Sequence, residues 1–395
     1  MASRCMYVRY FMKCCLPSFL FLLTVTIVPL DLVAEELRHA DESKKEMTIN
    51  NKLRLDHIAV WVADTEKTSH FLTEIMGWKR HPMEFGVSPE DKTTGGMQGV
   101  FFDANGLWLE TILPTSPGPG MDILKEKGDG AIVEINFEPD NYQAVIDDMK
   151  ARSIGMLNMD GSPLGDDGGV IKEGVTDEEG IDEHGQRIAY WPTKMSGGTT
   201  VEIYEYNEND DQGLLNIRNS MWENEKPDPN SPRTDRLAII VRDLESTAGF
   251  YTDVMGLKRH PMKFGVNAST NESIGGMKAA FIDANGIWLA LVQPVGPGPL
   301  MDYLDENGDG HVAELIVEVD DLGAYYDKMK AKGVTLINID GTPLNDEKKY
   351  HVLEPYGDKL AYIPEDVSCG ITIEVFERGP RETSLIHQRD DSWND

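Results

Sequence analysis

The amino-acid sequence predicts an α+β protein made of four modules, each with the order strand, helix, strand, strand, strand. The main observation is an internal repeat, because similar segments return at an offset of 179 or 180 residues. The matching pairs are 76–83 with 255–262, 103–109 with 283–289, and 158–164 with 338–344. A second observation is that strand and helix patterns occur twice within each half. Two homologous halves of two modules each follow.

The repeat sets the predicted domain boundaries. A first domain covers 53–206 and a second covers 234–379. Between them, 207–233 is rich in Asn, Asp and Pro and is predicted to be a polar linker. The last segment, 380–395, is predicted to be a tail. A length of 395 residues fits two domains of ordinary size.

The N-terminus differs in kind from the rest of the chain. Residues 1–13 contain three basic residues and no acid, and 14–33 are almost wholly apolar, followed by Ala34. This pattern predicts a secretory signal peptide over 1–34 and an exported protein, periplasmic or secreted. An uncleaved membrane anchor is the alternative, although Pro17 and Pro29 interrupt a spanning helix. The polar residues 35–52 are predicted to be a disordered leader.

Charge and cysteine content exclude several classes of function. The chain has 37 basic and 68 acidic residues and a formal net charge of −31. This balance argues against nucleic acids as partners and against membrane contact beyond the N-terminal segment. Of the four cysteines, only Cys369 lies after residue 34, so an intramolecular disulfide framework is excluded in the mature chain.

The first module begins with a strand at 55–62. Alternation along a strand places His57 on one face and the apolar residues Ile58, Val60 and Val62 on the other. The expected elements that follow are a helix over 65–76 and strands near 78–85, 98–103 and 106–113. A Pro- and Gly-rich run, 114–120, ends the module.

The second module has the same order. It begins with a strand at 131–138 and a helix from Asn141, in which an apolar stripe recurs at helical spacing. Strands are expected near 155–158, 187–192 and 199–206. The acidic, glycine-rich insertion 165–185 is predicted to be a mobile loop over a pocket.

These features resemble a known superfamily. The opening Leu55-Asp56-His57-Ile58-Ala59-Val60, with Asp64, an amphipathic helix and Met76-Gly77-Trp78 after it, is similar to the opening of a vicinal oxygen chelate module. That superfamily includes glyoxalase I, methylmalonyl-CoA epimerase, fosfomycin-resistance proteins and type I extradiol dioxygenases. The second half opens in a similar way at Asp235 to Ile240. The resemblance implies that the modules pair into two cup-shaped, mixed-sheet, glyoxalase-like domains.

The resemblance also implies one divalent metal ion in the first domain. The positions that match the family's ligands are His57, Glu110, Glu134 and Glu202, and many relatives have a histidine at the place of Glu134. One imidazole with carboxylates suits Mn²⁺, Ni²⁺, Co²⁺, Fe²⁺ or Zn²⁺. Without a cation, carboxylates at such close quarters would repel one another.

The second half departs from this pattern. Arg236 stands at the place of His57 and Ala290 at that of Glu110, whereas Glu314 and Glu374 remain. We therefore expect no metal there, but an ion pair between the arginine and the glutamates. The first domain is predicted to be the working half. The second is expected to be a scaffold or a ligand-binding half.

The function implied by the resemblance is metal-dependent isomerisation, epimerisation or lyase chemistry on a small hydroxy-carbonyl metabolite. Glu202 or Glu134 is the expected proton-transferring base. The alternatives are an Fe²⁺ dioxygenase that cleaves a ring or acts on a keto acid, and a non-catalytic ligand-binding or resistance protein. A small molecule is the expected partner, and oligomers are possible.

Other histidines and glycines have simpler interpretations. His81 and His260, each before a proline, are predicted to begin a strand or loop, with His81 a candidate for the pocket mouth. His184 in the insertion is a candidate acid or base from a lid. Gly128–Gly130 and Gly308–Gly310 are predicted to be turns.

Overall fold

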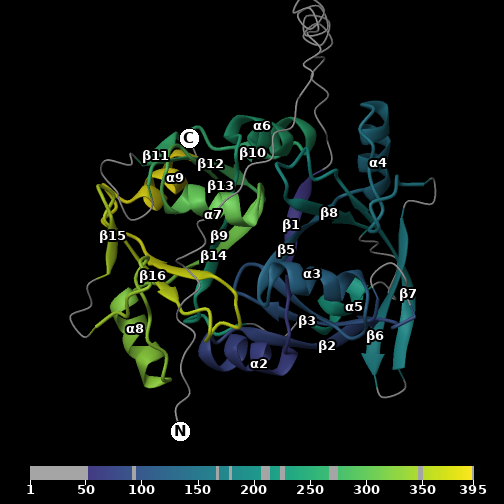
Figure 1. The fold of residues 1–395 in the computed structure, drawn as a ribbon, viewed down its shortest axis with the longest axis horizontal. Coiled ribbons are helices and arrows are strands. Elements are labelled where there is room, and N and C mark those ends of the chain that lie inside the picture. Colours follow the sequence, from purple (N-terminus) through teal and green to yellow (C-terminus); the bar gives the residue numbers. More distant parts are fainter. Residues whose placement is uncertain are drawn as a thin grey trace, which may run out of the picture. The chain divides into compact units, whose positions relative to one another are not determined.

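The computed structural model describes residues 52–90, 95–165, 169–177, 180–205, 214–222, 227–266, 275–345 and 350–393 (Figure 1). Within 170–186 only the course of the backbone is described. The predicted signal segment, nearly all of the predicted leader and the side chain of His184 lie outside the described part. No helix in the described ranges is both long and apolar enough to span a membrane.

Among its described residues, the first half contains eight strands, the two predicted helices and two further helices. The strands are β1 (Leu53–Trp61), β2 (Lys79–Val87), β3 (Met97–Asp103), β4 (Trp108–Pro114), β5 (Ala131–Pro139), β6 (Val170–Asp177), β7 (Gly180–Tyr190) and β8 (Thr200–Tyr204). The helices are α2 (Thr65–His70), continued by a π-helical turn η1 (Phe71–Ile75), α3 (Pro119–Lys127), α4 (Tyr142–Ala151) and α5 (Leu214–Met221). Asp64 and Asn141 cap α2 and α4 by accepting backbone N–H bonds. The predicted α+β class is confirmed.

The strands of the first half form a closed, mixed barrel. Their order is β1-β4-β3-β2-β6-β7-β8-β5. In it, β1 runs parallel to β4 and antiparallel to β5, and β5 runs parallel to β8. The first and last strands of both modules are therefore neighbours, which gathers their inward side chains in one place.

The insertion 165–185 is not the loop that the sequence predicted. It forms most of the β6–β7 hairpin, and β6 pairs with β2 at Phe85 and Gly86, which closes the barrel. The matching offset is 180 at Asn158 and Asn338 but 172 at Tyr190 and Tyr362, so the first half has eight additional residues between these points. These residues lengthen the hairpin enough to reach β2. The strand predicted near 155–158 is reduced to isolated bridges from Leu157 to Pro163 and to Tyr190.

The second half repeats the architecture with an open sheet. Its strands are β9 (Arg233–Ile240), β10 (Lys258–Arg259), β11 (Phe264–Val266), β12 (Met277–Asp283), β13 (Trp288–Pro294), β14 (His311–Glu318), β15 (His351–Leu353), β16 (Asp358–Ile363) and β17 (Ile373–Glu377). The helical elements are α6 (Leu244–Gly249), η2 (Phe250–Val254), α7 (Pro299–Asn307), α8 (Leu322–Ala331) and α9 (Leu385–Trp393). The sheet order is β10-β12-β13-β9-β14-β17-β16-β15, with β11 paired to β12.

Helices occupy two segments that the sequence predicted to be a linker and a tail. Helix α5 lies in 207–233 and α9 lies in 380–395. Their apolar residues are buried, with Leu215 only 4% and Ile386 only 1% exposed. Each helix thus belongs to the preceding domain. The helices α3 and α7, which follow the Pro- and Gly-rich runs, were also not predicted.

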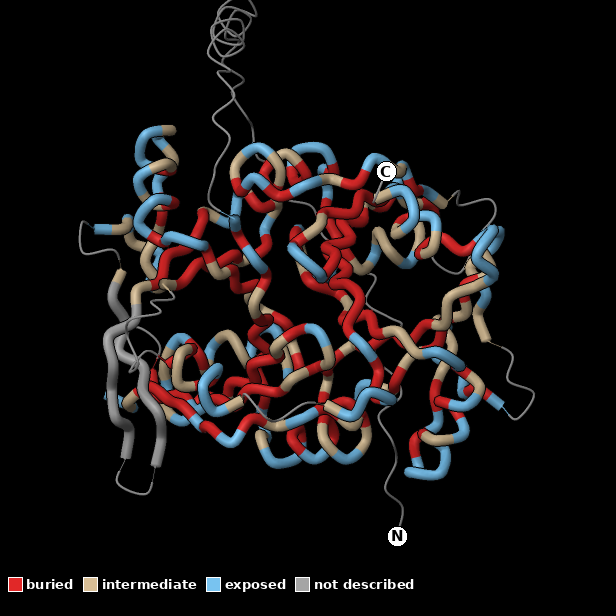
Figure 2. Tube along the Cα trace, turned by 180° about the vertical axis from the view of Figure 1, so that it is seen from behind, coloured by how far each residue is buried: buried red, intermediate tan, exposed pale blue. Residues whose placement is uncertain are grey.

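The main core lies between the sheets and their helices and includes residues of both halves (Figure 2). Ile58, Val60 and Val62 belong to it, as the alternation of β1 predicts. The halves also meet through glycines, because a Cβ at Gly130 would overlap the backbone at Gly370. These close contacts explain the second glycine of each predicted Gly-Asp-Gly turn, Gly130 and Gly310.

Candidate functional site

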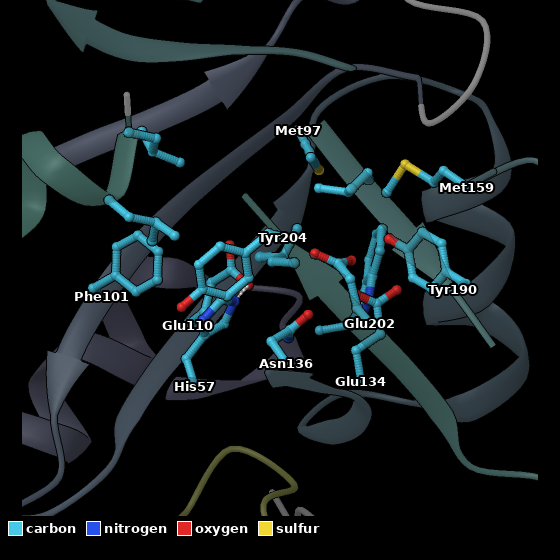
Figure 3. A pocket seen from close by; sticks show the side chains of 15 residues that line it. His57, Met97, Phe101, Glu110, Glu134, Asn136, Met159, Tyr190, Glu202 and Tyr204 are labelled. Carbon is cyan, nitrogen blue, oxygen red and sulfur yellow. Dashed lines mark ion pairs between the residues drawn. The ribbon is translucent and has the colours of Figure 1, made fainter. Parts of the chain in front are cut away.

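All four predicted metal-ligand positions line one pocket inside the first barrel (Figure 3). The other lining residues are Trp61, Met97, Phe101, Ile112, Asn136, Met159, Ile188, Tyr190, Tyr204, Leu214 and Leu215. The cavity has a volume of about 40 Å³. This is room for roughly three waters, or for an ion and a small group.

Strand register brings these residues together. Ala59, between His57 and Trp61 on the inward face of β1, pairs with Glu110 on β4 and with Glu134 on β5. On the other side of β5, Asn136 pairs with Glu202 of β8. Each carboxylate is therefore delivered by a strand next to β1 or β5.

His57 is held between two carboxylates. Its Nδ1 lies 2.7 Å from Oδ2 of Asp56, and its Nε2 lies 3.3 Å from Oε2 of Glu110. Burial by itself lowers the pKa of His57, but the hydrogen bonds to Asp56 and Glu110 outweigh it and raise the pKa to about 10. In this arrangement Nε2 is the ring nitrogen directed at the pocket.

Glu134 and Glu202 lie across the pocket from His57 and Glu110, with Asn136 between the two pairs (Figure 3). Burial and the negative charge of Glu110 raise the pKa of Glu134 to about 7. This carboxyl can therefore both release and accept a proton near neutral pH.

The pocket's donor set suits a divalent cation by its chemistry. Among the described residues, no three His, Cys, Asp or Glu side chains are grouped tightly enough to hold one ion. The two pairs nevertheless offer one imidazole and three carboxylates to a single cavity. A cation there would offset the repulsion that raises the pKa of Glu134.

Two buried N–H groups that line the pocket lack an acceptor among the described residues. They are Nδ2 of Asn136 and the indole Nε1 of Trp61. A buried N–H without a partner costs about 1–3 kcal/mol, so such groups point to a ligand that carries acceptor oxygens.

Sequence reasoning missed two residues behind His57. Asp56 accepts a bidentate pair of bonds from Arg218 of α5, at 2.7 and 2.8 Å. A signal for Arg218 was present, since Leu214–Trp222 shares Leu, Arg and Trp at matching places with Leu385–Trp393. The offset there is 171, and the match lay outside the predicted domains.

His81 does not line the pocket. Its Nε2 lies 2.8 Å from the backbone oxygen of Arg218, and its ring packs on Trp222. It therefore fastens α5 to the barrel. His260 makes the same contacts with Arg389 and Trp393 in the second half.

The cup of the second half is filled differently. Arg236 pairs with Asp235 at 2.8 Å and with Glu374 at 3.3 Å, which confirms the predicted ion pair with that glutamate. Ile316 and Ile240 stand at the places of Asn136 and Trp61, within an apolar cluster that also contains Ala290. The second cup thus has apolar residues where the first has Trp61, Glu110 and Asn136.

Comparisons with known proteins agree with this architecture. The family model described as Glyoxalase/Bleomycin resistance protein/Dioxygenase superfamily matches residues 54–181 and 233–362. The ethylmalonyl-CoA/methylmalonyl-CoA epimerase of Cereibacter sphaeroides is 29% identical over 106 residues, covering 27% of this chain and 74% of that protein. The mitochondrial methylmalonyl-CoA epimerase of Mus musculus is 28% identical over 151 residues, covering 38% and 71%.

One solved structure matches both halves. A mutant of 4-hydroxymandelate synthase from Streptomyces coelicolor aligns with a TM-score of 0.56 and 16% identity, covering 86% of this chain and 98% of that one. At this identity the likeness concerns the fold alone. It confirms the prediction of two tandem domains of the glyoxalase type.

Proposed function

Because this chain belongs to the Glyoxalase/Bleomycin resistance protein/Dioxygenase superfamily, we propose that its first domain is a divalent-metal-dependent enzyme. The proposed reaction moves a proton next to a carbonyl group, in an isomerisation, epimerisation or elimination. The proposed substrate is a small hydroxy-carbonyl metabolite. The observation that carries the proposal is that one imidazole and three carboxylates share a pocket in the first half, whereas Arg236 and Ala290 replace two of them at the matching positions of the second half.

His57, Glu110, Glu134 and Glu202 would hold the ion. When bound, a divalent ion supplies positive charge that stabilises an enolate or other oxyanion. One of these carboxylates would remain beside the ion as the base. The number of available carboxylates allows this division of roles.

Glu134 is the first candidate for the base, and Glu202 is the second. In the metal-free protein, burial and the charge of Glu110 raise the pKa of Glu134 to about 7, so this carboxylate takes up a proton more readily than an exposed glutamate does. It would take a proton from the carbon next to the carbonyl and return it to the same or a neighbouring atom. Its side chain lines the same cavity as His57.

The unpartnered donors support a substrate rich in oxygen. Nδ2 of Asn136 and Nε1 of Trp61 would donate to its hydroxyl or carbonyl oxygens. The small cavity favours a compact reacting group. The epimerase names of the matching relatives support a proton transfer beside a carbonyl.

The test combines metal content with proton exchange. We expect one divalent ion per chain after loading, lost in His57→Gln and retained in Arg236→Gln, as measured by plasma mass spectrometry. In D₂O, NMR should show deuterium entering next to the carbonyl of at least one 2-hydroxy-carbonyl compound. Glu134→Gln should slow this exchange about 10²-fold or more while metal remains bound.

Other outcomes would overturn the proposal. Metal-dependent oxygen uptake with a keto acid or catechol, without proton exchange, would favour a dioxygenase. Tight ligand binding with neither reaction would favour a binding protein. Equal loss of metal in the Arg236→Gln variant would remove the asymmetry between the halves on which the proposal depends.

A further inference from the structure

We propose that Arg218, on helix α5, is a positioning residue for His57, acting through Asp56. It would fix the ring so that Nδ1 carries a proton toward Asp56 and Nε2 faces the pocket. This inference rests on the proposed function for its consequence, metal binding, but its geometric content can be tested without metal. It assigns a role in the site to a segment that the repeat pattern places outside the domain.

The contacts form a short chain of buried polar groups. Both terminal nitrogens of Arg218 donate to Asp56, one to each oxygen, and the arginine side chain is only 1% exposed. Asp56 Oδ2 also accepts from Nδ1 of His57 at 2.7 Å. A bidentate guanidinium holds a carboxylate in one plane, so the direction of its free lone pair is fixed.

Arg218 is itself held on every side. Its guanidinium lies 4.8 Å above the ring of Trp108 and 5.0 Å from that of Phe101. Its backbone oxygen is bound by His81. Because the arginine is held in one place, it also holds Asp56 in one place. Hydrogen-bond partners of metal-bound histidines commonly orient the ring in this way.

The direction of the bonds determines which nitrogen is available. A carboxylate paired with arginine only accepts hydrogen bonds, so Nδ1 of His57 must be the donor. The remaining nitrogen, Nε2, is the one 3.3 Å from Glu110 at the pocket. Loss of Arg218 would let Asp56 turn and would free the ring of His57 to rotate.

The second half provides a matched control. Arg389 of α9 binds Asp235 in the same bidentate way, at 2.8 and 2.9 Å, and stacks on Trp288. The residue after this aspartate is Arg236, so no histidine depends on the pair. A purely structural role of the pair should therefore give equal effects in the two halves.

The experiment compares Arg218→Gln with Arg389→Gln in the full chain. The first readout is the proton NMR signal of the Nδ1–H of His57, assigned by its absence in His57→Gln. The second is the Kd for Co²⁺ as a probe metal. Both variants should lose similar unfolding free energy. Only Arg218→Gln should shift or lose the Nδ1–H signal, and only it should weaken Co²⁺ binding, by about 10- to 100-fold.

Each outcome decides the inference. An unchanged Nδ1–H signal in Arg218→Gln would overturn it, as would equal weakening of Co²⁺ binding in both variants. If Arg218→Gln fails to fold, Arg218→Lys keeps the charge without the bidentate geometry and should give the same changes in smaller degree. If the wild-type protein binds no Co²⁺, the proposed function fails, and the NMR signal alone tests the positioning role.

Discussion

In the second cup, Glu314 lies close to the carboxylate of Glu374, but the neighbouring cation, Arg236, pairs with Glu374. Burial and the charge of Glu374 raise the pKa of Glu314 to about 8. The hydroxyl of Tyr362 donates to Glu374 at 2.9 Å. Glu314 is therefore a carboxyl of the second cup that keeps its proton at neutral pH.

This carboxyl should make the protein less stable as the pH rises. Between its unfolded pKa of 4.5 and about 8, the folded state holds the proton that the unfolded state has released, so stability falls with pH across this range. Glu314→Gln should remove this pH dependence and stabilise the protein at pH 8.5, because glutamine carries no charge. The expected gain in unfolding free energy is roughly 1–3 kcal/mol, since the side chain is partly exposed and water reduces the effect.

Urea unfolding at pH 5.5 and 8.5 measures this effect. The exposed Glu306→Gln serves as the control for charge removal. The prediction is contradicted if Glu314→Gln and Glu306→Gln leave the same difference in stability between the two pH values. Glu134, with a pKa raised to about 7, adds a change of the same sign in metal-free protein.

At the scale of elements, α5 both lines the pocket and contributes an arginine that binds Asp56 behind His57. Leu214 and Leu215 line the pocket, and Arg218 reaches behind His57. Helix α9 puts Leu385 and Ile386 into the apolar cluster of the second cup. The helix that ends each half therefore lines the pocket in the first half, whereas in the second half it contributes side chains to the apolar cluster.

Truncation of Leu215 should enlarge the pocket. Leu215→Ala is expected to cost about 2–3 kcal/mol of unfolding free energy and to extend the range of chain lengths among exchanged 2-hydroxy-carbonyl compounds. Ile386→Ala, the matching change in α9, should cost a similar amount and leave that range unchanged. An identical substrate range in wild type and Leu215→Ala would show that α5 does not limit the pocket.

The sequence predicted most elements of the fold because their patterns are local. The alternation of β1 and the apolar stripe of α4 need no knowledge of distant residues. The β6–β7 hairpin was missed because its glycine-rich, acidic composition resembles that of a loop. Its strands are stabilised by pairing with β2, which lies far away in the sequence. Helices α5 and α9 were missed because each is short and packs on strands that lie far away in the sequence.

The site was predictable only in part, for a similar reason. His57 and the three glutamates occupy the positions that match the ligands of the superfamily that the sequence resembles, so they were found as one group. Asn136 and Trp61 carry no motif, and the opening motif that contains Asp56 does not reveal its bonds to His57 and Arg218. Their roles become visible only when the bonds that they make or lack are known.

At the scale of the whole molecule, the two halves are joined by backbone contacts that exclude side chains. Gly130 abuts the backbone of Cys369 and Gly370, and Gly310 abuts that of Gly198 and Thr199. The hydroxyl of Thr199 also donates to the backbone oxygen of Gly310 at 2.9 Å. The turns of one half are therefore part of the packing of the other.

A methyl group at this contact should separate the halves. Gly130→Ala adds a Cβ that overlaps the backbone of the opposite half and also strains a residue with φ of +81°. We expect a loss above about 3 kcal/mol, from both strain and overpacking. Gly128→Ala is the control, because its φ of +95° is strained but its Cβ would meet nothing within 4 Å. Equal losses in thermal unfolding would contradict a role for the contact.

The aspartate–arginine pairs also record the history of the gene. Asp56 with Arg218 and Asp235 with Arg389 occupy matching positions, and each pair is flanked by the same histidine and tryptophan contacts. The unit that was duplicated therefore already ended in this helix and already contained the pair. The change between histidine and arginine at 57 and 236 came afterwards, so the support behind the site is older than the difference between its two copies.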